Sequence, residues 1–102
     1  MNAISPGEKL ALNANLVLRV RYAPVKQPFV QPQTPASTTL AAAKALALTH
    51  FGLTEGAVDG GTKTYEISVD ETVQTNLSLT LGELATHGRQ IELLLIEQFQ
   101  QG

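Results

Sequence analysis

The sequence predicts an α+β domain in which a mixed sheet of four to five strands packs on one α-helix. Two alternating segments of β-forming residues, 16–22 and 64–69, flank a single helical segment at 40–51. A further apolar segment at 91–96 lies near the end of the chain. With 102 residues, 43% of them hydrophobic, the chain can form one modest core but not two. One sheet covered by one helix meets these conditions.

Composition and charge narrow the classes of function. The chain has seven Lys and Arg against nine Asp and Glu, whereas nucleic-acid-binding domains usually show a basic excess. It has no Cys, which excludes disulfide scaffolds, Cys-based zinc sites and thiol catalysis. No apolar segment reaches the roughly 20 residues of a membrane span, and the first residues lack the features of a secretory signal. We therefore expect no nucleic-acid partner, no membrane and a cytoplasmic location.

The first strand is expected at 16–22, after a flexible leader over residues 1–14. Its strict alternation is typical of a strand with one face on a core. A second strand at 27–31 contains Pro28 and is followed by Pro32. Because proline donates no backbone hydrogen bond, we expect this second strand at an edge of the sheet. On the first strand the apolar face carries Leu16, Leu18, Val20 and Tyr22, and the opposite face carries Val17, Arg19 and Arg21.

The helix is expected at 40–51, after a Pro-rich loop. Thr38 or Thr39 can cap it, since a hydroxyl oxygen accepts hydrogen bonds from free N–H groups of the first turn. Gly52 stands where a left-handed C-cap belongs, and Leu53 can make the apolar contact beyond it. One alanine-rich stripe allows a close approach to the sheet; its members are Leu40, Ala43, Ala47, His50 and Phe51.

After the helix we expect a flexible Gly-rich loop over 53–62 and a strand at 64–69. Residues 70–71 indicate a turn, because Asp favours turns. Leu77 and Leu79 suggest a short fourth strand.

The last part of the chain is expected to hold one helical turn and a long strand. Residues 80–83 have the form of a capping box that opens a single helical turn. The strand at 90–97 is apolar on both faces, which is typical of a central strand or of one whose outer face is a contact surface. Residues 98–102 lose apolar content, so we expect a flexible C-terminal tail there.

This order of elements, with the first and last strands in the middle of the sheet, predicts a β-grasp arrangement. At three segments the residues are similar to the ubiquitin-like family, and the resemblance covers about residues 15–102. It implies a ubiquitin-like β-grasp domain over 15–97. The three segments are Thr39-Leu40 with Lys44 and the Gly52-Leu53 cap, the turn Thr80-Leu81-Gly82-Glu83-Leu84, and Ile91–Ile96 followed by a short tail that stops at glycine.

The resemblance implies a protein modifier that is not itself an enzyme and needs no cofactor. Gly102 would be adenylated by an E1-like activating enzyme, passed as a thioester to an E2-like conjugating enzyme, and joined to target proteins through an isopeptide bond. A processing peptidase is a further implied partner. Glycine suits this chemistry because it has no side chain to obstruct a narrow active site. Ubiquitin ends in two glycines after arginines, whereas Gln100-Gln101-Gly102 fits a bacterial ubiquitin-like protein with dedicated enzymes.

A partner-binding surface is expected on the outer face of the sheet, where the family has its recognition patch. Its candidate residues are Leu94, Ile96, Val17 and Arg19. The neighbouring strand is polar on this face, so the patch is narrow and mixed in charge, with Glu66 or Glu92 as cross-strand neighbours of the arginines. The alternative is that the leader covers this face through Leu10 and Leu12.

Two other hypotheses remain beside the modifier. A non-covalent interaction module, or a small subunit of a larger complex, would keep its function without Gly102 and lose it on Leu94→Asp or Ile96→Asp. A sulfur carrier would end in a thiocarboxylate, although that family ends in paired glycines. His50 and His87 show no metal-ligand spacing, so we expect no metal site and no catalytic residue. The prolines of the second strand protect that edge from sheet extension, so we expect a monomer.

Overall fold

A computed structural model describes residues 14–85 and 88–101. In this part the chain forms one six-stranded sheet and two helices, so the predicted α+β class is confirmed. The sheet is larger than the four to five strands expected, and a short second helix accompanies the first. The elements are β1 (Asn15–Tyr22), β2 (Val25–Pro35), α1 (Leu40–Phe51), β3 (Gly56–Val58), β4 (Gly61–Val69), β5 (Thr72–Gln74), α2 (Leu81–Leu84) and β6 (Gln90–Gln101).

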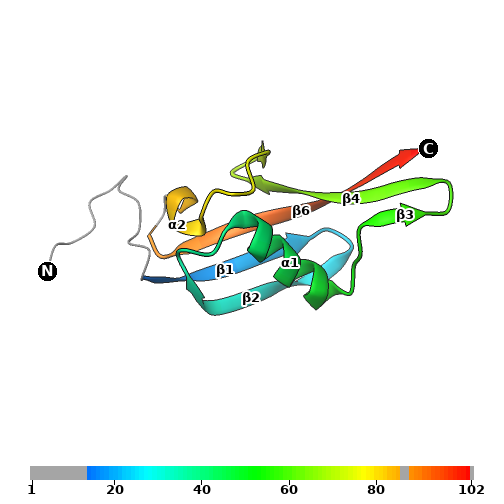
Figure 1. Cartoon of the computed structure of the whole chain (residues 1–102). Coiled ribbons are helices and arrows are strands. Elements are labelled where there is room, and N and C mark those ends of the chain that lie inside the picture. Colours follow the sequence, from blue (N-terminus) through cyan, green and yellow to red (C-terminus); the bar gives the residue numbers. More distant parts are fainter. Residues whose placement is uncertain (1–13, 86–87, 102) are drawn as a thin grey trace, which may run out of the picture.

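The sheet is mixed, with the strand order β2-β1-β6-β4-β3, and β5 also pairs with β4. β1 pairs antiparallel with β2 and parallel with β6, and β6 pairs antiparallel with β4. β1 and β6 therefore lie in the middle of the sheet and β2 at its edge, as the sequence predicts. Figure 1 shows α1 lying across one face of this sheet.

The core lies between α1 and the inner face of the sheet. The alternation in β1 is confirmed, because every second residue is buried. The helix contributes the small side chains of Ala43 and Ala47, which let it lie close to the strands. The buried residues from the main elements are Leu16, Leu18, Val20, Tyr22, Leu40, Ala43, Ala47, Tyr65, Ile67, Val69, Ile91, Leu93 and Leu95.

Both ends of α1 are capped as predicted. The Thr39 hydroxyl oxygen accepts a hydrogen bond from the Ala42 N–H at 3.2 Å. Gly52 has a φ of +70°, a left-handed conformation that side chains disfavour, and Leu53 packs against the core. The Thr80 hydroxyl likewise accepts the Glu83 N–H at 3.2 Å and opens α2.

The strand expected at Leu77 and Leu79 is not present; the sequence prediction is wrong there. The carbonyl groups of these two residues accept hydrogen bonds from the Ala41 and Leu40 N–H groups at 3.0 and 2.9 Å. These donors belong to the first turn of α1, which has no partner for them inside the helix. The side chains of both leucines pack against the core. The apolar pattern therefore reflects a loop that closes the helix end, and the short strand β5 precedes it.

Three segments are more extended than expected. β3 and the start of β4 lie within the predicted Gly-rich loop, and β2 continues to Pro35. β6 runs to Gln101, so Gln98–Gln101 are not the flexible tail that we expected after Glu97. Figure 1 shows the β3–β4 hairpin and the end of β6 projecting together beyond α1. Residues 1–13 of the leader predicted over 1–14, together with His87 and Gly102, lie outside the described residues.

Within the described part of the chain, neither helix has the length and apolar character needed to cross a membrane.

Candidate interaction surface

The strand register brings the predicted partner-binding residues onto the outer face of the sheet. In the parallel β1–β6 pair, Arg21 lies opposite Leu94, and in the β4–β6 pair Glu66 lies opposite Ile96. Leu94 is 41% exposed although it stands on a central strand, while Ile96 is half-buried. Val17 and Arg19 occupy the same face of β1. The side chains that sequence analysis singled out thus share one surface.

Charges on this face are paired rather than purely basic. The Arg19 Nε lies 3.7 Å from Glu92 Oε2, and the Arg21 Nη1 lies 3.9 Å from the same oxygen. Both arginines are about half exposed or more, so these ion pairs are worth at most about 1 kcal/mol. Glu92 is the cross-strand neighbour expected from the sequence. A partner on this surface would meet an apolar centre bordered by a compensated charge cluster.

The outer face is hollowed where β1 ends. A depression of about 470 Å³ is lined mainly by apolar groups and includes both Leu94 and Ile96. A second depression of about 260 Å³ lies on the other side of Leu94. Leu94 therefore forms a ridge between two hollows, which alternation alone did not predict. The residues around the larger one are Tyr22, Ala23, Pro24, Leu94, Leu95, Ile96 and Glu97.

A polar cluster on the inner face supports this end of the surface. The Tyr22 and Tyr65 hydroxyl groups donate hydrogen bonds to Glu97 Oε1 at 3.0 and 3.1 Å, and Lys63 Nζ lies 4.0 Å from it. The two tyrosine hydrogen bonds are the main reason why the pKa of Glu97 is lowered. Burial, followed by the neighbouring carboxylate, raises the pKa of both tyrosines. This cluster joins β1, β4 and β6.

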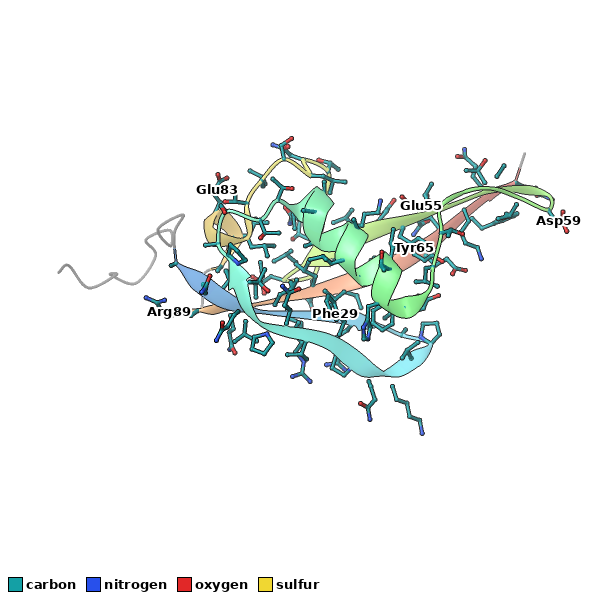
Figure 2. All side chains as sticks on the ribbon, turned by 60° about the horizontal axis from the view of Figure 1, so that its bottom comes forward. Phe29, Glu55, Asp59, Tyr65, Glu83 and Arg89 are labelled. Carbon is teal, nitrogen blue, oxygen red and sulfur yellow. The ribbon has the colours of Figure 1, made fainter. Side chains whose placement is uncertain are left out.

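A groove between α1 and β2 is a second candidate surface, which sequence analysis did not predict. It has a volume of about 690 Å³ and a largely apolar lining. Phe29 stacks on His50 in the last turn of α1, with ring centroids 4.6 Å apart. Leu46 on this helix face is 41% exposed. The sequence feature that could have indicated this groove is the pair Ala42 and Ala45, two small helix residues that line it. Figure 2 labels Phe29 beside the helix.

The predicted conjugation residue, Gly102, directly follows the last residue of β6 but lies outside the described residues. No protein-family model, curated protein or solved structure matches this chain.

Proposed function

We propose that this chain is a ubiquitin-like protein modifier with a β-grasp fold, activated at Gly102. The observation that supports the proposal best is the topology. An antiparallel β1–β2 hairpin is followed by a helix across one face, and β6 then returns through the middle of the sheet parallel to β1. This is the arrangement that the family resemblance implies. Fold alone does not assign a role, because one fold serves many functions.

The chemistry needs a chain end that enzymes can reach. An oxygen of the Gly102 carboxylate attacks the α-phosphorus of ATP and releases pyrophosphate. A cysteine thiolate of the E1-like enzyme then displaces AMP, and after transfer to the E2-like enzyme a target amine displaces the thiol. The exposed side chains of Gln98–Gln101 support this use, and the backbone of these residues, which pairs with β4, would have to separate from β4 for Gly102 to enter a narrow active site.

The outer face of the sheet supplies a docking surface for these enzymes. Leu94 and Ile96 border the depression at the end of β1, on the strand that leads to the chain end. An enzyme bound there would hold the modifier while the chain end reaches the active site. Val17 and Arg19 extend the same face along β1.

The test is a denaturing blot of N-terminally tagged protein expressed in its native host. Wild type is compared with a chain lacking Gly102 and with Gly102→Ala. We expect a ladder of heavier bands for wild type that disappears with the deletion. A single unmodified band in every lane, under conditions in which the partner enzyme genes are known to be expressed, overturns conjugation.

A non-covalent interaction module is the second candidate, and the exposed ridge at Leu94 favours it. Leu94→Asp should abolish partner capture whether or not Gly102 is present, since it replaces the apolar side chain of the ridge with a hydrated carboxylate beside Arg21. Leu46→Asp is a matched control, because Leu46 is also 41% exposed but lies on the α1–β2 groove. Equal loss of capture in the two variants would contradict a site on the outer face.

A further inference from the structure

The end of β6 has one unpaired edge. β1 pairs with β6 only as far as Tyr22 opposite Leu95, whereas β6 continues to Gln101 with β4 on its other side. Within the described residues no strand lies beside Ile96–Gln101 on the β1 side. Figure 1 shows this end projecting past the end of β1. A central strand of the sheet thus becomes an edge strand over its second half.

The register shows which backbone groups point to the open edge. The Val17 N–H on β1 donates to the Arg89 carbonyl at 2.7 Å. Backbone groups of alternate residues point to the same side of a strand. Counting in steps of two from Arg89, the N–H and C=O groups of Glu97, Phe99 and Gln101 point to the open edge. Such groups are a template for pairing with a further strand.

This open edge of β6 lacks the features that protect the edge strand β2. β2 carries Pro28 and Pro32, which cannot donate hydrogen bonds to an added strand. Residues 96–101 contain no proline and no basic residue, and their one charge belongs to Glu97, which is hydrogen-bonded to two tyrosines. Phe99 is 52% exposed, the largest exposed fraction among the big hydrophobic side chains described. An open edge without proline or a basic residue is suited to pairing with a further strand.

We propose that this edge pairs antiparallel with the same edge of a second copy, about a two-fold axis at Phe99. This register places Phe99 opposite Phe99 of the second copy and Glu97 opposite Gln101. All the open-edge groups are then bonded on both copies, and no carboxylate faces another, while each Phe99 ring lies toward Gly60 and Gly61 on the β4 side. Shifting by one ladder step leaves either Glu97 or Gln101 without a partner. The open edge of a second copy therefore matches the hydrogen-bonding groups of the first.

The proposed pairing is weak, and the argument for it does not rest on conjugation at Gly102. A contact over so few residues buries well below the about 1,200 Å² of a stable interface. It therefore operates at high local concentration, and it adds self-association to a chain that the prolines of β2 led us to expect as a monomer.

The test is a dilution series followed by backbone NMR, from about 1 mM to about 20 µM, the range in which a weak complex dissociates. We expect concentration-dependent shifts centred on the amides of Glu97, Phe99 and Gln101, with slower tumbling at the high end. Concentration-independent spectra, or shifts confined to β2 or to Leu94, overturn the proposal.

Two lysine variants test the register. Phe99→Lys places like charges on the two-fold axis and should abolish the shifts. Gln98→Lys adds the same charge but faces Gln100 of the second copy, so association should persist. The reverse result contradicts an axis at Phe99. If Phe99→Lys lowers stability, Gln101→Pro removes one open-edge donor without touching a bond to β4, and it should weaken association at least several-fold.

Discussion

The Glu55 carboxylate accepts a hydrogen bond from the backbone N–H of Tyr65 at 2.7 Å. Tyr65 lies on a part of β4 that has no outer neighbour, because β3 ends its pairing at Lys63 and β5 begins at Ile67. Lys44 on α1 contacts the same carboxylate at 2.8 Å. Figure 2 shows Glu55 and Tyr65 side by side near the end of the helix. Glu55 thus takes the place of a strand and joins α1 to β4.

Removing the Glu55 carboxylate should destabilise the domain more than neutralising it. Glu55→Ala leaves the Tyr65 N–H without its acceptor, and an unsatisfied partly buried donor costs about 1–3 kcal/mol. Glu55→Gln keeps an acceptor oxygen for the Tyr65 N–H and loses only the charge that pairs with Lys44, so its loss of stability should be smaller than that of Glu55→Ala, which loses both contacts. Urea unfolding of both variants measures the difference. Equal losses would show that the hydrogen bond to Tyr65 contributes nothing.

The same carboxylate gives the stability a defined pH dependence. Burial alone would raise the pKa of Glu55, but the hydrogen bond from Lys44 and that from the Tyr65 N–H together lower it below the ordinary value of 4.5. A group whose pKa is lowered by folding stabilises the fold above its unfolded pKa. This contribution should be full above pH 4.5 and lost as the pH falls through the lowered pKa.

The pKa of Glu97 is also lowered, so Glu97 too makes the protein less stable in acid. The difference in unfolding free energy between wild type and Glu55→Gln therefore isolates the contribution of Glu55. The free energy of unfolding, measured by urea at a series of pH values, should decline less steeply in acid for Glu55→Gln. Parallel curves for the two proteins would contradict a lowered pKa at Glu55.

The sequence predicted those elements whose patterns are local. β1 and α1 were predicted because alternation, capping residues and alanine-rich turns act within one segment. The end of β6 was missed because Gln98–Gln101 carry no apolar alternation, and their extended form depends on pairing with β4. Leu77 and Leu79 were misassigned because their apolar side chains at alternate positions are typical of a strand. In the structure their carbonyl groups instead accept hydrogen bonds from the first turn of α1.

The candidate surface on the outer face of the sheet was predicted only in part, again because only its local pattern can be read from the sequence. Strand alternation was enough to place Val17, Arg19, Leu94 and Ile96 on one face. The depression beside Leu94 and the cluster around Glu97 depend on where β1 ends relative to β6, which only the register determines.

Gly61 should be required for the close pairing at the end of β6. A Cβ there would collide with the Gln100 carbonyl oxygen and lie 2.9 Å from the Phe99 Cζ. Gly61→Ala should therefore move the end of β6 away from β4. We expect faster amide exchange at Gln98 and Gln100, whose N–H groups face β4, and unchanged protection in the core. Thr62→Ala, at an exposed neighbour, is the control, and similar exchange in both variants would refute the steric argument.

The tyrosine hydroxyl groups should determine the pKa of Glu97. Tyr22→Phe and Tyr65→Phe each remove one hydrogen bond that stabilises the carboxylate, so each should raise the pKa of Glu97, and the double variant should raise it further. Lys63→Met should have a smaller effect, because its amino group lies at 4.0 Å and both partners are partly exposed. A carbon-detected NMR titration of the Glu97 carboxyl group measures these shifts. A larger effect from Lys63→Met than from the tyrosine variants would mean that the ion pair, rather than the two hydroxyl groups, maintains the charge where β1, β4 and β6 meet.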